Sequence, residues 1–223
     1  MTSIITQLKA TEKWRMGLIL FALSLFCFGL SLFRIYISGT RSFFFLNWNL
    51  FLAAIPWIAS SYLSIKQKSK LKTISILLLW ILFFPNAPYI LTDLFHLRFF
   101  TSAPIWFDLV LVLSFAWTGL IFGFLSLNDL YKLGSNWMTN RWLKITTVLL
   151  LFLSAYGIYI GRYLRWNSWD IFTQPIRLFQ EITAPIAEPF HHPKAWGMTI
   201  LLGVLLNIMF WTLHQWKMQK ADF

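Results

Sequence analysis

The stretch LKTISILLLWILFFPNAPYILTDLFHL, residues 71–97, begins like a membrane-spanning helix but carries two prolines and an asparagine inside its apolar run. A helix that starts at Leu71 advances about 22 Å before it reaches Pro85, whereas about 30 Å of hydrocarbon must be crossed. Pro85 and Pro88 lack amide hydrogens, so carbonyl groups one turn earlier lose their partners, and Asn86 can cap a new helix. We therefore predict a helix that is kinked or broken at Pro85–Pro88, within its outer third.

The composition of the whole chain indicates an all-α membrane protein. Of its 223 residues, 58% are hydrophobic and only 12% are charged, which is far from the composition of a soluble domain. Runs of about 20 apolar residues, long enough to cross a bilayer, recur along the chain. These runs are 14–37, 43–63, 71–91, 105–127, 143–163 and 196–216. We predict a polytopic bundle of about six helices that forms a single integral membrane domain over residues 1–223.

The basic residues predict the orientation of the bundle. Lys and Arg are enriched in the cytoplasmic segments of membrane proteins, and the stretch KQKSKLK, residues 66–72, joins the second and third runs. Placing it in the cytoplasm puts both termini there too, and leaves 93–101 and 166–194 outside. The net charge of +11 is then explained by topology, and we expect no nucleic-acid binding because no recognition module is visible.

The arginines are distributed differently from the lysines. Ten of the eleven lysines fall on the cytoplasmic side, whereas six of the eight arginines fall on the outer side, where topology does not favour positive charge. Such arginines indicate ion pairs or contacts with anions. For Arg34 and Arg41, snorkelling to lipid headgroups is an equal alternative. The outer arginines are Arg34, Arg41, Arg98, Arg162, Arg165 and Arg177.

Polar residues recur at the outer ends of several runs. If the segment after the break is α-helical, four of them form one stripe, namely Asn86, Tyr89, Asp93 and His96. Others on the second, fourth and fifth helices lie at a similar depth. Hydrocarbon cannot satisfy these groups, so we expect them to face the bundle interior or a watery cavity. The alternative is that the prolines only bend the helix, with its last residues solvated. The residues are Asn49, Asn86, Tyr89, Asp93, His96, Asp108, Arg162, Arg165, Asn167 and Asp170.

Two further patterns concern packing and the outer surface. Trp169, Phe172, Ile176 and Phe179 recur at helical spacing, which predicts an amphipathic helix over about 168–183 that lies on the outer leaflet and could roof the polar residues. Glycine pairs such as Gly119 with Gly123 are typical of close helix packing.

Three blocks carry a resemblance to a known family. They are NWNLFLAAIPW (47–57), FFPNAPYILTDLFHL (83–97) and GIYIGRYLRWNSWD (157–170). Over about residues 40–215 the chain resembles domain-of-unknown-function family 1361, a group of bacterial multi-pass membrane proteins. The resemblance implies a location in the bacterial plasma (inner) membrane, and it implies no activity, because no catalytic residue is known for the family.

The functional hypothesis therefore depends on the polar residues. Asp93, His96, Asp108 and Asp170 are the candidates for acid/base chemistry. The candidate substrate is an anionic lipid or lipid-linked headgroup, whose phosphate the arginines would hold. No metal site and no cofactor are assigned, since the sequence brings no three ligands together. The candidate substrate-binding residues are Asn49, Asn86, Tyr89, Arg162, Arg165 and Asn167.

Two alternatives to a lipid-processing site remain. The chain could be a non-enzymatic scaffold in which the arginines and carboxylates pair only to hold the bundle together. It could also be a small-solute permease, because discontinuous helices often build substrate sites, although such sites usually lie near the bilayer midplane. The sequence leaves open whether the protein is an enzyme.

Overall fold

The structure is a computed structural model that describes residues 2–65, 69–98, 102–166 and 170–219. Within these ranges the chain is helical and contains no strand. Its internal contacts divide it into two compact units, an N-terminal unit, Met1–Leu133, and a C-terminal unit, Gly134–Phe223. The single domain over residues 1–223 stays a prediction.

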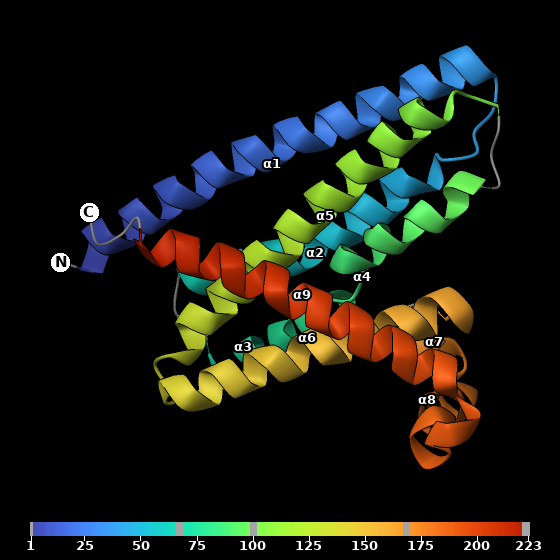
Figure 1. Cartoon of the computed structure of the whole chain (residues 1–223). Coiled ribbons are helices and arrows are strands. Elements are labelled where there is room, and N and C mark those ends of the chain that lie inside the picture. Colours follow the sequence, from blue (N-terminus) through green and yellow to red (C-terminus); the bar gives the residue numbers. More distant parts are fainter. Residues whose placement is uncertain (1, 66–68, 99–101, 167–169, 220–223) are drawn as a thin grey trace. The chain divides into compact units, whose positions relative to one another are not determined.

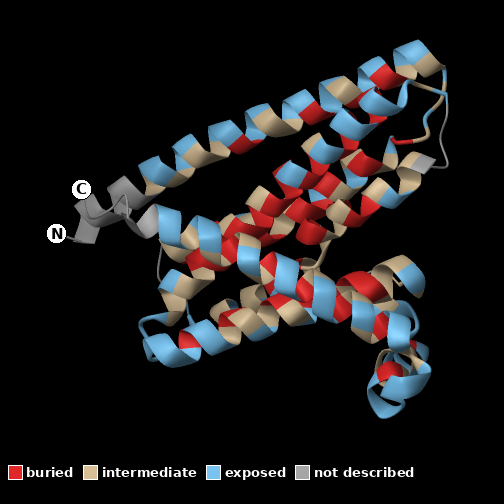
Figure 2. Ribbon diagram, in the orientation of Figure 1, coloured by how far each residue is buried: buried red, intermediate tan, exposed pale blue. Residues whose placement is uncertain are grey.

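The N-terminal unit is built from long helices with one interruption (Figure 1). Helix α5 and the facing side of α2 carry much of its buried surface (Figure 2), and Leu111, Val112 and Phe115 of α5 lie in its core. Its elements are α1 (Thr2–Ser38), α2 (Phe45–Ile65), α3 (Lys70–Phe83), α4 (Asn86–Tyr89), the 3-10 helix η1 (Ile90–Arg98) and α5 (Ile105–Gly134).

The C-terminal unit consists of two long helices joined by a segment of short ones. The long helices α6 and α9 pack against each other. A Cβ on Gly203 of α9 would overlap the ring of Phe152 of α6, so this glycine allows the close approach. The elements are α6 (Asn140–Tyr163), α7 (Asp170–Thr173), α8 (Pro175–Ala187), the 3-10 helix η2 (Pro189–His191) and α9 (Pro193–Gln219).

The prediction of six membrane-spanning helices is confirmed for the described part of the chain. Many large apolar side chains are exposed on these helices, as expected where lipid rather than water is the surrounding medium. Six segments there are long and apolar enough to cross a bilayer: Ala10–Ser38, Phe45–Ile65, Lys70–Leu97, Ile105–Gly134, Asn140–Tyr163 and Pro193–Trp216.

The third span is broken at the prolines, as predicted, but its second half differs from the prediction. Helix α3 ends at Phe83, one turn of α4 follows, and the chain continues as the 3-10 helix η1. The N-cap position of α4 is Pro85, and Asn86 is the first residue of the helix rather than its predicted cap. Its Nδ2 instead donates to the carbonyl of Phe83 at 3.0 Å, at the end of the helix that the prolines interrupt.

Two glycines position this break against α5. A Cβ on Gly119 would lie 2.7 Å from the carbonyl oxygen of Ala87, and a Cβ on Gly123 would lie 2.9 Å from the Cβ of Ala87. Side chains at these positions would therefore push α4 away from α5. The prediction that Gly119 and Gly123 serve close packing is confirmed.

The predicted amphipathic helix is interrupted and displaced. Helix α7 ends at Thr173, Gln174 has non-helical angles (φ −140, ψ 58), and α8 then runs from Pro175 to Ala187. Proline is favoured in the first turn of a helix and disfavoured inside one, which explains why the helix restarts at Pro175. An amphipathic helix is therefore present in this region, as α8, but its bounds differ from the predicted 168–183, and residues 168 and 169 lie outside the described ranges.

Candidate functional site

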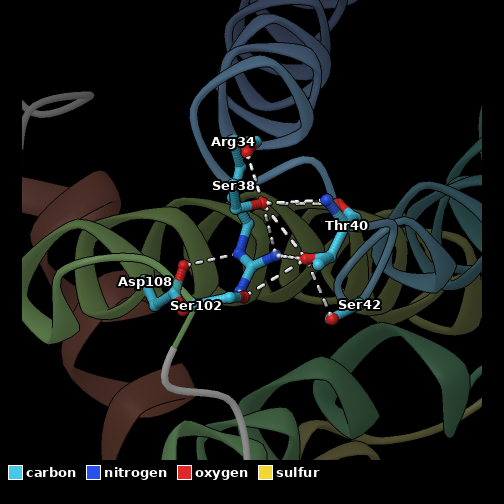
Figure 3. A network of polar contacts seen from close by, with 6 residues as sticks. All are labelled: Arg34, Ser38, Thr40, Ser42, Ser102 and Asp108. Atoms are coloured by element: carbon cyan, nitrogen blue, oxygen red, sulfur yellow. Dashed lines mark hydrogen bonds and ion pairs between the residues drawn. The ribbon is translucent and has the colours of Figure 1, made fainter.

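Arg34 and Asp108 form a buried ion pair between α1 and α5 (Figure 3). Nε of Arg34 donates to Oδ1 of Asp108 at 2.6 Å, and one terminal nitrogen donates to Oδ2 at 3.0 Å. The guanidinium also donates to Thr40 Oγ1 at 3.1 Å, and it lies 4.7 Å from the ring centre of Phe43. Since both charged side chains are 1% exposed, the ion-pair interpretation holds for Arg34, and Asp108 is engaged in a structural contact.

A second ion pair joins the same two helices near their other ends. Lys13 of α1 contacts Asp129 of α5, and Ser60 Oγ of α2 donates to the same carboxylate at 3.0 Å. Lys13 and Arg34 are 21 residues apart, and so are Asp108 and Asp129. At 1.5 Å per residue the two pairs are about 31 Å apart along the helices, which corresponds to an antiparallel register with both acids on α5.

The carboxylate of Asp93 lies at the broken span, next to α2. Asn49 Nδ2 of α2 donates to its Oδ2 at 3.0 Å, and the Asp93 residue is fully buried. Nδ1 of His96 lies 3.6 Å from Oδ1 of Asp93 and 3.3 Å from its carbonyl oxygen. The His96 side chain is 28% exposed, and its ring lies 5.2 Å from that of Phe45. The candidates Asn49, Asp93 and His96 are therefore brought together.

The other candidates on the broken span lie at its start. Asn86 bonds to the end of α3 as described, and the carbonyl of Tyr89 accepts a hydrogen bond of 2.7 Å from Thr92 Oγ1. Both residues are partly buried. Because η1 is a 3-10 helix, residues three apart eclipse one another, so Asp93 and His96 share a face, whereas the longer α-helical stripe from Asn86 to His96 was wrong.

The remaining candidates belong to the C-terminal unit. Arg162 lies in the last turn of α6, and Arg165 is exposed and has a φ of 60. The Asp170 carboxylate accepts a hydrogen bond of 3.2 Å from Thr173 Oγ1 within α7. Asn167 lies outside the described residues. The convergence of these residues with Asp93 and Asp108 of the other unit stays a prediction.

A polar contact that the sequence did not indicate joins the end of α6 to α8. The indole nitrogen of Trp166 donates to Oε2 of Glu181 at 2.7 Å, and Arg177 Nε donates to Oε1 at 3.0 Å. The hydrogen bond from Trp166, followed by the bond and charge of Arg177, holds the pKa of Glu181 below its ordinary range. The i, i+4 spacing of Arg177 and Glu181 could be recognised in the sequence. The contact with Trp166 could not, because the short helix α7 lies between the two residues in the chain.

The described residues contain no cluster of side chains suited to bind a metal ion. No three side chains of His, Cys, Asp or Glu come together there in a way that could hold an ion. Cys27 is buried, with its sulfur 3.5 Å from Thr118 Oγ1. Asp93 and His96 can form hydrogen bonds and transfer a proton through their own side chains.

The six spans and the buried polar contacts define a multi-pass helical membrane protein. The family model described as "Protein of unknown function (DUF1361)" matches residues 48–209, and the chain belongs to this family. That match includes Asn49, Asp93, His96 and Asp108. The comparisons with curated proteins and with solved structures gave no significant match.

Proposed function

We propose that this protein binds, and through His96 processes, an anionic lipid or lipid-linked headgroup at the end of its broken third span. The supporting observation is the arrangement of a fully buried carboxylate, Asp93, beside a partly exposed imidazole, His96. In this proposal His96 contacts the headgroup and gives or takes a proton, and Asp93 is a positioning residue.

The contacts around Asp93 support this division of roles. Asn49 donates to one carboxylate oxygen, while the other oxygen is on the side of the imidazole. A carboxylate held in this way can orient a histidine ring, as in other acid/base sites. A protonated imidazole would also attract the phosphate of a headgroup.

A scaffold without enzymatic activity is the second candidate. It is favoured by the Arg34–Asp108 and Lys13–Asp129 pairs. In each pair, both charged side chains belong to the N-terminal unit. Paired charges of this kind serve to hold helices together. The permease alternative gains no specific support.

The orientation and location are also proposals. The cytoplasmic placement of both termini rests on the distribution of lysines, and the bacterial plasma membrane rests on the family resemblance. With this orientation, Asp93 and His96 face the extracytoplasmic side.

The deciding experiment compares three variants in a strain that lacks the protein. We expect His96→Gln and Asp93→Asn to reach normal membrane abundance but to fail in restoring the lipid profile. Both swaps keep the shape of the side chain, while the first removes the group that transfers the proton and the second removes the charge that positions it. Asp108→Asn is the matched control for a buried carboxylate, and we expect it to lower abundance by stranding Arg34. Full restoration of the lipid profile by His96→Gln would exclude the proposed site and leave the scaffold.

A further inference from the structure

The amphipathic helix α8 carries an exposed apolar side within the C-terminal unit. The buried residues of α8 are Leu178 and Pro185, and the rest of its surface is largely exposed (Figure 2). Ile176, Phe179 and Ile186 are 76%, 68% and 56% exposed. At about 100° per residue, these three lie within about 80° of one another around the helix. They therefore form one continuous surface, which we call the apolar face of α8.

Two hydrogen bonds tie α8 to the ends of two membrane spans. The hydroxyl of Tyr156 donates to the carbonyl of Ile182, and the indole nitrogen of Trp196 donates to the carbonyl of Pro185 at 2.8 Å. Tyr156 lies about two turns before the end of the span Asn140–Tyr163, and Trp196 lies in the first turn of the span Pro193–Trp216. Helix α8 therefore lies beside the spans at the level where they end.

Aromatic side chains mark this level as the membrane interface. The rings of Tyr156 and Tyr159 stack with centres 6.1 Å apart, and those of Tyr159 and Tyr163 with centres 5.6 Å apart. The ring of Trp196 stacks on that of Tyr156 at 6.5 Å. Tyr and Trp are enriched where hydrocarbon meets water, because an apolar ring and a polar tip suit that boundary. The group to which α8 is hydrogen-bonded therefore belongs to an aromatic belt.

The polar side of α8 is directed away from the apolar face. Glu181 accepts a hydrogen bond from Trp166, which lies beyond the last turn of α6. Around the helix, Glu181 lies about 140° to 160° from the three residues of the apolar face. With Glu181 turned to the end of the span, the apolar face is turned back toward the level of the acyl chains.

The charge of the connection between the two spans bears on which lipids it contacts. Residues 164–192 include two arginines and three acidic residues, so their charges nearly cancel. Helices that depend on anionic lipids carry an excess of Lys and Arg on their polar face. Contact of α8 with a bilayer would therefore depend on burial of apolar surface rather than on headgroup charge.

From these observations we infer that α8 lies along the membrane interface and inserts its apolar face into the boundary between lipid headgroups and acyl chains, whatever the headgroup charge. The bilayer that surrounds α6 and α9 reaches this face, because α8 is bonded to the ends of both helices. The inference concerns the C-terminal unit and does not rest on the function proposed for Asp93 and His96.

The test measures membrane depth with spin labels on the full chain in phosphatidylcholine nanodiscs. A nitroxide is attached in turn to Ile176→Cys, Phe179→Cys and Ile186→Cys, and the wild type is the blank for the buried Cys27. Dissolved oxygen concentrates in hydrocarbon, whereas a neutral nickel chelate stays in water. We expect collisions with oxygen to exceed collisions with the chelate at all three positions. Because these side chains are exposed, we expect the variants to fold normally.

Ala184→Cys is the matched control on the same helix. Ala184 is partly exposed and lies about 20° around the helix from Arg177, on the polar side. We expect collisions with the nickel chelate to exceed those with oxygen at this position. Such a reversal between two sides of one helix would show how α8 is rotated at the interface.

Three results would overturn the inference. A predominance of the nickel chelate at any position of the apolar face would place that face in water. Exclusion of both reagents from the face would show that protein covers it, such as a second copy of this chain. The measurement is repeated with phosphatidylglycerol added to the nanodiscs, and unchanged collision rates support insertion by apolar burial. Insertion that occurs only with phosphatidylglycerol would mean that headgroup charge is recognised, which contradicts the inference.

Discussion

Nε of Arg34 lies 2.6 Å from Oδ1 of Asp108, inside the N-terminal unit and almost without contact with solvent. The two residues are 74 positions apart in the chain, so the pair links α1 directly to α5. Three hydroxyl groups, those of Ser38, Thr40 and Ser102, lie within hydrogen-bond distance of the same guanidinium. Because these contacts hold the guanidinium from several sides, we expect the pair to be structural.

Neutralising one member of this pair should be more harmful than removing both. We expect Asp108→Asn to destabilise the protein by about 3 to 5 kcal/mol, because it leaves the Arg34 charge buried without its counter-ion. The double variant Arg34→Met with Asp108→Leu should recover most of that loss. Thermal unfolding in detergent measures both effects, and an Asp108→Asn variant as stable as the wild type would contradict the structural role.

Gly119→Ala should weaken the contact between the broken span and α5. A Cβ at this position would lie 2.7 Å from the carbonyl oxygen of Ala87, and overpacking of this kind typically costs about 1 to 3 kcal/mol. Gly29→Ala in α1 is the matched control, because a Cβ there meets nothing within 4 Å. Removing a helical glycine at such a position should be neutral or stabilising by up to about 1 kcal/mol. Equal unfolding temperatures for the two variants would refute the packing role.

The contact of Glu181 with Trp166 should depend on pH below the ordinary range of a carboxyl group. The pKa of Glu181 is lowered from 4.5, first by the hydrogen bond from Trp166 and then by Arg177. A carboxylate whose pKa is lower in the folded state stabilises that state above its ordinary pKa, and the stabilisation is lost as pH falls through the lowered value. The contact should therefore persist through pH 4.5 and release only at lower pH.

Fluorine NMR of 5-fluorotryptophan at position 166 can follow this release. We expect one transition with a midpoint below pH 4.5, absent in Glu181→Gln. Arg177→Gln should move the midpoint upward, because it removes a bond and a charge that favour the carboxylate. Lys194→Gln is the control and should leave the midpoint in place. A wild-type midpoint at or above 4.5 would be inconsistent with the hydrogen bond.

Cysteine labelling should establish the orientation of the spans. The native Cys27 is fully buried, so it does not interfere. We expect Ser69→Cys to react with a membrane-impermeant maleimide only after the cells are permeabilised. Phe190→Cys is the control at a site that is 96% exposed, and it should react in intact cells. Labelling of Ser69→Cys in intact cells would reverse the proposed topology.

The sequence was sufficient to predict the six spans and the break within the third one. Apolar runs of bilayer length leave few alternatives, and Pro85 and Pro88 cannot continue a regular hydrogen-bond ladder. The form of the chain after the break was not predictable, because residues such as Asp93 and His96 at i, i+3 fit both α and 3-10 geometry. The interruption at Gln174 was also not predictable. The apolar periodicity across this region suggested one helix, whereas a new helix begins at Pro175.

The sequence predicted how deep each charged residue lies in the membrane better than it predicted which residue each one contacts. Arg34 and Arg41 lie at similar depth in the sequence pattern, but Arg34 contacts Asp108, whereas Arg41 follows the end of α1 at Ser38. Whether Arg34 faces α5 depends on the rotation of α1 about its axis, and a nearly uniform hydrophobicity around that helix does not reveal this rotation. By contrast, Asn49 could be expected near Asp93, since both are polar groups in otherwise apolar spans and such groups pair in membranes.

The two ion pairs between α1 and α5 also fix the length of apolar helix that this helix pair presents to the bilayer. Lys13 with Asp129 and Arg34 with Asp108 hold the helices together at two levels, about 31 Å apart, so neither helix can slide along the other to shorten its apolar stretch. Bilayers differ by several ångströms in hydrocarbon thickness, and each ångström of mismatch costs a fraction of a kcal/mol. In a thinner or thicker membrane the lipid, rather than this helix pair, would have to deform, and the protein would be sorted to membranes that match it.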